Sequence, residues 1–214
     1  MSRVILHLIE PDTEDSTVAD AILSTEERER AARFVFDSDR TRWTAIRAAA
    51  RRILASYLDT DPASIEWKAG EGGKPYIPSE EFEFNLSHSG ELAALAVSTA
   101  GPVGIDLEPV SRAIQLPECE ESFCHPLELS DLPKEPSLRA LALLELWTAK
   151  EALLKAHGSG LAFPPTSLRI EGTRGIADLP GLDQFHLLRP LRKSRPEFSI
   201  AVAVPLRINE IDLA

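Results

Sequence analysis

The sequence predicts an α+β fold of two halves, each combining one long helix with several short strands. Apolar residues recur with helical spacing over about 37–58 and again over 138–157. Short apolar runs bounded by glycine, proline or serine accompany both helices. We therefore place an N-terminal half at 1–108, a connector at 109–136 and a C-terminal half at 137–214.

The N-terminal half begins with a buried strand, predicted over residues 4–9. Ser24 and Glu27 have the spacing of a capping box and start a short helix. The long helix that follows is expected to be capped by Asp37 or Ser38. The apolar stripe of this helix is interrupted by arginine, and we expect it to pack on the strands of this half. Strands are predicted over 65–68, 82–86, 92–98 and 103–107, with turns at 70–75, 87–90 and 99–102.

The connector differs from both halves because five prolines stand among its acidic residues. We expect one short helix in it, near 127–132. The second long helix runs to His157 and is ended by Gly158. Three strands are then predicted, over 167–171, 184–191 and 198–204.

The composition restricts the class of partner. A net charge of −11 over 214 residues argues against a nucleic-acid binder. Basic residues nevertheless crowd one region, which favours a small anionic ligand. They are Arg28, Arg30, Arg33, Arg40, Arg42, Arg47, Arg51 and Arg52. With two cysteines, no signal-like start and no apolar run of about 20 residues, we expect a cytoplasmic protein without a membrane segment.

One predicted strand carries two carboxylates on the same face. Asp106 and Glu108 alternate with apolar neighbours, so their Cα atoms lie roughly 6.5–7 Å apart. One hard cation, magnesium or manganese, could bridge their oxygens. Gly104 in the same row would leave room for a ligand. The alternative is an amphipathic strand with a solvated acidic face.

The second long helix places Glu151 on the same side as Leu144, Trp147 and Leu154. A carboxylate in an apolar stripe needs a cation inside the fold. The alternative is a surface pair with Lys155, worth about 0.3–0.5 kcal/mol.

A polar cluster follows the apolar strand at 82–86. Ser87 and His88 can donate hydrogen bonds to a phosphate, and Lys74 lies in the preceding glycine-rich loop. The alternative is an ordinary polar turn. Arg47 and Arg51 lie one helical turn apart, so both could point into one pocket or belong to a charged helix surface.

Four stretches, in this order, resemble motifs of the 4′-phosphopantetheinyl transferase superfamily, and specifically of its larger Sfp-type branch. They are Gly73-Lys74-Pro75, Phe84-Asn85-Leu86-Ser87-His88-Ser89, Gly104-Ile105-Asp106-Leu107-Glu108 and Trp147-Thr148-Ala149-Lys150-Glu151-Ala152 with Lys155. The turn Gly158-Ser159-Gly160-Leu161 is also similar to the family's glycine turn. The resemblance covers residues 73–161.

The resemblance implies two similar α+β halves related by a pseudo-two-fold, each with a long helix on a small, mostly antiparallel sheet, and coenzyme A between them. It implies a magnesium site, with manganese as substitute, at Asp106, Glu108 and Glu151. Glu151 and Lys155 would be the catalytic residues. Coenzyme A would be held by Arg30, Arg42, Arg51, Gly73, Lys74, Pro75, Asn85, Ser87, His88, Lys150 and Lys155. Glu27 departs from the family, where some members carry lysine.

The implied reaction moves 4′-phosphopantetheine from coenzyme A to a serine of an apo acyl or peptidyl carrier protein, giving adenosine 3′,5′-bisphosphate. A monomer is expected. Two alternatives remain open on the residues: another magnesium-dependent nucleotide diphosphate hydrolase, and a non-catalytic module that binds coenzyme A or a carrier.

Overall fold

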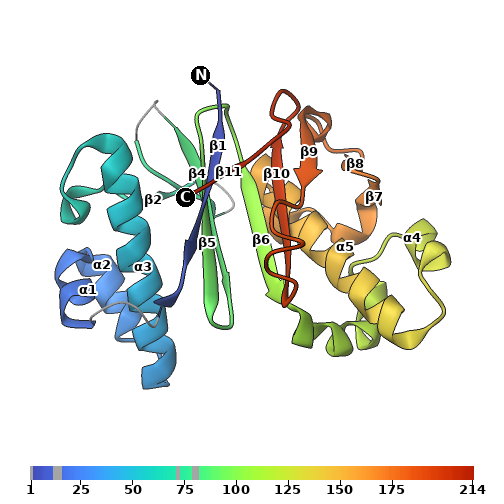
Figure 1. Cartoon of the computed structure of the whole chain (residues 1–214), viewed down its shortest axis with the longest axis horizontal. Coiled ribbons are helices and arrows are strands. Elements are labelled where there is room, and N and C mark those ends of the chain that lie inside the picture. Colours follow the sequence, from blue (N-terminus) through green and yellow to red (C-terminus); the bar gives the residue numbers. More distant parts are fainter. Residues whose placement is uncertain (1, 12–15, 71–72, 79–81) are drawn as a thin grey trace.

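The computed structural model describes residues 2–11, 16–70, 73–78 and 82–214. Glu71 and Gly72 of the predicted glycine-rich loop lie outside the described residues. Two sheets lie between two long helices, which confirms the α+β prediction (Figure 1). Among the described residues, no helix has both the length and the apolar character needed to span a bilayer.

The long helix α3 (Asp37–Leu58) covers the outer face of the first sheet, and two shorter helices pack on α3 (Figure 1). The predicted capping box is present: Ser24 Oγ accepts from Glu27 N at 3.2 Å, and Glu27 Oε2 accepts from Ser24 N at 2.9 Å. The long helix lacks the predicted cap, because its N-cap position is Phe36, which makes no side-chain hydrogen bond. The three helices are α1 (Ser16–Ile22), which the sequence did not predict, α2 (Thr25–Ala31) and α3 (Asp37–Leu58).

The first sheet has the strand order β11-β1-β5-β4, and only the β1–β11 pair is parallel. Its strands are β1 (Val4–Ile9), β4 (Glu83–Ser89), β5 (Leu92–Ser98) and β11 (Asp212–Leu213). β4 continues beyond its predicted end, because Ser87 and His88 pair with Ala94 and Ala93 of the fully buried β5. Ser87 and His88 therefore lie on a strand and not in the predicted turn.

A small two-stranded sheet precedes β4, formed by β2 (Lys68–Ala69) and β3 (Pro75–Tyr76). The strand predicted over 65–68 is wrong except for its last residue. Ile65 is buried, but its carbonyl oxygen accepts a hydrogen bond from Arg51 instead of joining a ladder.

The second sheet has the order β6-β10-β9 and is antiparallel. α5 (Pro136–His157) packs on it and ends at Gly158, whose φ of +91° is the left-handed conformation that glycine favours. The remaining elements of this half are β6 (Gly104–Pro109), the 3₁₀ helix η4 (Val110–Glu118), α4 (Pro126–Asp131), β7 (Arg169–Glu171), β8 (Arg174–Ile176), β9 (Phe185–Leu188) and β10 (Phe198–Pro205).

One hydrophobic core lies between the two sheets, and two more lie under the helices. Alternate residues of β5, β6 and β10 share the central core. The other face of β5 packs under α3, and the other face of β10 packs under α5. β6 pairs with β10 in the second sheet, and β11, from the end of the chain, pairs with β1 in the first. The predicted boundaries after residues 108 and 136 stay predictions.

The two sheets meet where the edge strand β4 lies beside the edge strand β6. Asn85 Oδ1 accepts a hydrogen bond from Ile105 N at 2.9 Å, and Asn85 is buried. Lys74 Nζ donates to Val103 O at 3.1 Å and to Ala156 O at 3.3 Å. These bonds join the side chains of Asn85 and Lys74 to backbone groups across the junction.

Gly104 fixes the distance between β6 and α5. An alanine Cβ there would lie 2.1 Å from Ala152 O and 2.3 Å from Ala156 N. The space that the sequence assigned to a ligand is therefore filled by the helix backbone. This close approach brings Glu151 and Lys155 of α5 over the β6 carboxylates.

Candidate active site

The centre of the site is an ion pair between β6 and α5. Lys155 Nζ donates to Asp106 Oδ1 at 2.6 Å and lies 3.6 Å from Glu151 Oε2. Ser87 Oγ of β4 donates to the same Asp106 oxygen at 3.0 Å. The elements β4, β6 and α5 thus bring together four of the predicted site residues, which lie up to 68 positions apart in sequence.

Two carboxylate oxygens in this cluster are buried and have no hydrogen-bond partner among the described residues. They are Oδ2 of Asp106 and Oε1 of Glu151. A buried carboxylate oxygen without a donor is unfavourable unless a cation or a ligand satisfies it. Magnesium is commonly held by one or two carboxylates together with substrate phosphates and water. The donor set at Asp106 and Glu151 fits such a cation.

Glu108 does not share this arrangement. Its Oε2 accepts from Ser89 Oγ at 2.5 Å, and its Oε1 accepts from Arg112 Nη1. Within the part of the chain that the structure describes, no group of three His, Cys, Asp or Glu side chains is arranged to hold a metal ion. The three carboxylates predicted to act together are therefore not assembled into one group here.

Burial, with a smaller contribution from the negative charge of nearby Glu151, raises the pKa of Asp106 to about 6 against the opposing positive charge of Lys155. Burial outweighs the ion pair because a carboxylate removed from water loses more solvation than one lysine restores. Additional positive charge near the free oxygen of Asp106 would therefore stabilise its ionised form.

This pKa predicts how the stability of the chain depends on pH in the presence of a chelator. Between about pH 4 and 6 the folded state keeps a proton on Asp106 that the unfolded state has lost, so the free energy of unfolding falls as pH rises. Asp106→Asn should remove that fall and unfold at higher urea concentration than the parent at pH 7.5. Urea titrations at pH 4.5 and 7.5 measure the difference, and an equal pH dependence in both proteins would contradict it.

A pocket lies on the α3 side of the cluster, and in its lining Arg42 Nη1 lies 3.8 Å from Asp39 Oδ1. It has a volume of about 170 Å³ and is lined by Phe34, Asp39, Arg42, Trp43, Ile46, His88 and Gly90. The Nε atom of Arg42 is buried without a hydrogen-bond partner in the described structure, and Arg30 lies 5.4 Å from the Trp43 ring centroid. An aromatic ring beside two arginines suits a ligand that has a base and a phosphate.

His88 lies at the border between this pocket and the carboxylate cluster. Surrounding protein atoms, followed by the positive charges of Lys155 and Arg30, lower the pKa of its imidazole, although the residue as a whole stays exposed. At neutral pH the ring is therefore uncharged and can still donate one N–H.

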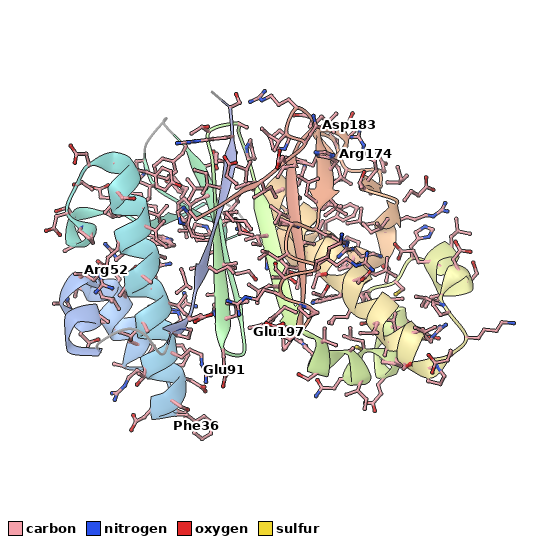
Figure 2. The ribbon with its side chains drawn as sticks, in the orientation of Figure 1. Phe36, Arg52, Glu91, Arg174, Asp183 and Glu197 are labelled. Carbon is pink, nitrogen blue, oxygen red and sulfur yellow. The ribbon has the colours of Figure 1, made fainter. Side chains whose placement is uncertain are left out.

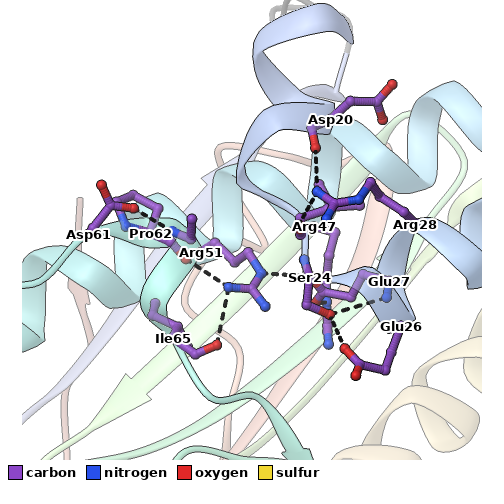
Figure 3. Close-up of polar contacts among 12 residues, drawn as sticks. Asp20, Ser24, Glu26, Glu27, Arg28, Arg47, Arg51, Asp61, Pro62 and Ile65 are labelled. Carbon is purple, nitrogen blue, oxygen red and sulfur yellow. Dashed lines mark hydrogen bonds and ion pairs between the residues drawn. The ribbon is translucent and has the colours of Figure 1, made fainter.

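Arg51 is buried and bonds to protein atoms through Nε and Nη1, and its predicted contact with coenzyme A stays a prediction. Its side chain is 1% exposed, and it donates to Glu27 Oε2 at 2.7 Å, Pro62 O at 2.7 Å and Ile65 O at 3.2 Å. Arg47 bonds to the other oxygen of Glu27 (Figure 3). Glu27, where some family members have lysine, is the buried carboxylate that holds both arginines and joins α2 to α3.

Lys150 is likewise buried among contacts within the protein, and its predicted contact with coenzyme A stays a prediction. It is 1% exposed and donates to Phe123 O at 2.8 Å and Pro165 O at 3.0 Å, and it pairs with Glu128 Oε2 at 2.6 Å. These contacts use the three donors of its ammonium group. Glu128 also accepts from His125 N and Ile170 N, so the pair joins the connector to α5 and β7.

The remaining predicted ligands lie around the junction of the two sheets. Lys74 and Asn85 bond to backbone across the junction, as described above. Pro75 pairs with Ala69 in the small sheet, and Gly73 is exposed with a φ of +80°. Their contact with coenzyme A stays a prediction.

Two residues of the site, Ser89 and Arg112, were not predicted from the sequence. Ser89 lies two residues after Ser87 on the same strand face, which the alternation of a strand could have indicated. Arg112 lies at the start of η4, four residues after Glu108 on β6.

Figure 2 labels Glu91, in the β4–β5 turn, and Glu197, just before β10, at the lower middle of the molecule. Ser89 ends β4 beside this turn, and Val110 N donates to Glu197 O two residues before Arg112, so Ser89 and Arg112 extend the site in that direction.

Comparison with known protein families divides the chain in the same place as its two sheets. Residues 9–100 match the family described as 4′-phosphopantetheinyl transferase, N-terminal. Residues 102–202 match the 4′-phosphopantetheinyl transferase superfamily.

Curated relatives agree with these matches. The chain is 38% identical over 162 residues to 4′-phosphopantetheinyl transferase HetI of Nostoc sp., covering 72% of this chain and 67% of that protein. It is 33% identical over 217 residues to a phosphopantetheinyl transferase of Thraustochytrium sp., covering 91% and 74%. The transferase Sfp of Bacillus subtilis is 32% identical over 152 residues, covering 70% and 66%.

These alignments span about two thirds to three quarters of each relative's length. The family match over residues 102–202 includes β6 and α5, which supply Asp106 and Glu151 to the site. The predicted family and its enzyme class are thereby confirmed. The chain belongs to the 4′-phosphopantetheinyl transferase superfamily, with Sfp and HetI among its relatives.

Proposed function

We propose that this chain transfers 4′-phosphopantetheine from coenzyme A to a serine hydroxyl of an apo acyl or peptidyl carrier protein and releases adenosine 3′,5′-bisphosphate. One observation carries the proposal: two buried carboxylate oxygens without partners lie beside Lys155 and next to a pocket lined by Arg42, Trp43 and His88. A diphosphate joined to a nucleotide has the charge and shape that this combination favours.

In this proposal the pocket holds the nucleotide and the cluster holds the diphosphate. Arg42 and Arg30 lie where they can neutralise phosphate oxygens, and the Trp43 ring offers a face for the base. Ser87 and His88 can donate hydrogen bonds between the two regions. Binding at both ends would orient the diphosphate relative to the incoming hydroxyl, which is the main contribution that positioning makes to phosphoryl-type transfer.

The chemical step requires charge neutralisation and removal of a proton. Magnesium, or manganese in its place, would be held by Asp106 and Glu151 and would neutralise the diphosphate. Lys155 adds a fixed positive charge beside the leaving phosphate. The free Oε1 of Glu151 can accept the proton of the serine hydroxyl, but a carboxylate that holds a cation is a weaker base, so we assign Glu151 first as a ligand.

Mass spectrometry of an apo carrier incubated with coenzyme A, magnesium and this chain tests the proposal. We expect the carrier to gain the mass of one phosphopantetheine group on serine, with adenosine 3′,5′-bisphosphate in the supernatant. A diphosphate hydrolase would release both halves of coenzyme A and leave the carrier unmodified, and a binding module would leave both unchanged. An unmodified carrier in assays with fatty-acid, polyketide and peptide carriers would overturn the proposal.

A further inference from the structure

Glu108 is the one carboxylate of the predicted metal triad whose two side-chain oxygens both have partners in the described structure. Ser89 Oγ donates to Oε2 at 2.5 Å, and Arg112 donates to Oε1. Asp106 and Glu151 each keep one buried oxygen without a partner. The three carboxylates thus differ in what they can offer to a cation.

Arg112 reaches Glu108 from the first turn of η4, four residues further along the chain. The start of η4 is fixed by a hydrogen bond from Val110 N to Glu197 O at 2.8 Å. The side chain of Glu108 is 9% exposed, whereas that of Arg112 is 45% exposed. The arginine can therefore move into water at little desolvation cost, while the carboxylate cannot leave the site.

We propose that Arg112 competes with the divalent cation for Glu108 and so sets the affinity of the cation site. This inference rests on the proposed function, because it takes Asp106 and Glu151 as cation ligands. When Arg112 holds Glu108, the cation has two carboxylates. When Arg112 turns to solvent, Oε1 of Glu108 becomes the third.

The competition has a simple energetic form. Arg112 and a cation cannot both occupy Oε1 of Glu108, so the apparent dissociation constant of the three-carboxylate site is its intrinsic value divided by the fraction of molecules in which the ion pair is broken. Asp106 and Glu108 lie on one face of β6, with Cα atoms roughly 6.5–7 Å apart, so a cation at Asp106 can reach Glu108 without movement of the strand. The partly exposed side chain of Arg112 thus adjusts the affinity of the site for the cation.

Manganese binding to the full chain, followed by electron paramagnetic resonance without coenzyme A or carrier, tests the inference. Arg112→Ala should tighten Mn²⁺ binding about two- to fivefold, the range expected for loss of one partly exposed ion pair. Arg112→Lys keeps the charge but loses the planar fork and should give a smaller gain.

Arg139→Ala is the matched control because it removes the same charge and the same type of pair. Arg139 donates to Glu120 at 2.7 and 2.8 Å. It lies twelve residues before Glu151 on α5, a rise of about 18 Å. Its loss should leave Mn²⁺ affinity unchanged. An equal gain in this variant would show a general charge effect and overturn the inference.

A double variant tests whether Arg112 acts through Glu108. In a Glu108→Gln background, Arg112→Ala should no longer tighten Mn²⁺ binding. A gain that persists there, or an unchanged or weaker affinity in Arg112→Ala alone, would overturn the inference while leaving the proposed transfer intact. A parent chain without a specific Mn²⁺ site would overturn the cation site itself. Carrier assays fail or succeed independently of these titrations.

Discussion

Replacing Gly104 by alanine is expected to destabilise the folded chain by about 3 kcal/mol or more, the upper end of the cost of overpacking. The added methyl would lie 2.1 Å from Ala152 O and 2.3 Å from Ala156 N, which are backbone atoms of α5. The backbone atoms of a hydrogen-bonded helix cannot move independently, whereas the end of a side chain can change rotamer. Relief therefore requires that α5 move away from β6 and take Glu151 and Lys155 with it.

Gly175→Ala provides the control for this prediction. An alanine Cβ at Gly175 would meet the side-chain methyls of Leu153, Leu168 and Leu182 at 2.9 to 3.2 Å. These leucines can shift rotamer, so the cost should fall near the lower end of the range of about 1–3 kcal/mol. Urea unfolding of both variants measures the difference. Equal losses, or a Gly104→Ala variant as stable as the parent, would contradict the close approach of helix and strand.

Glu151→Gln is expected to lower kcat for carrier modification by about 10²–10³-fold, the size of effect seen when one charge-stabilising group of an active site is removed. Glutamine keeps the shape of the side chain but offers a weaker ligand to the cation and no base to the serine hydroxyl. Because Glu151 Oε1 has no partner among the described residues, the exchange breaks no hydrogen bond of that oxygen, and the fold should persist.

The same measurement on Glu145→Gln separates a site effect from a general loss of negative charge on α5. Glu145 lies on the same helix and pairs with Arg192 in an exposed contact. Its variant should keep the rate of the parent. Full activity in Glu151→Gln would remove Glu151 from the site, and an equal loss in Glu145→Gln would point to the helix surface instead.

Most of the fold was predictable because its signals are local. The capping box at Ser24 and Glu27, the glycine that ends α5 and the apolar strand β5 are each specified within a few residues. The elements missed are short or depend on distant partners. β11 has two residues and no pattern of its own, and it is a strand only because β1 lies beside it.

The site was predictable where side chains share one face of one element. Asp106 lies in a row with Glu108, and Glu151 lies one turn from Lys155. The roles of Arg51 and Lys150 depended on partners that are 24 and 22 residues away in sequence, Glu27 and Glu128. A helical wheel argues against a shared site for Lys150 and Glu151, because the two residues lie about 100° apart around the helix. No comparable signal separates Arg51 from Arg42.

The pairing of β11 with β1 has a consequence for the order of folding. Ile5 faces Asp212 across the ladder, so the whole second sheet and α5 are inserted, in sequence, between two adjacent strands of the first. Such a long-range contact forms late, because the intervening chain must be ordered before its closure entropy is recovered. On the ribosome the outer edge of β1 would stay open until residue 212 has emerged. An open strand edge is a template for pairing between nascent chains.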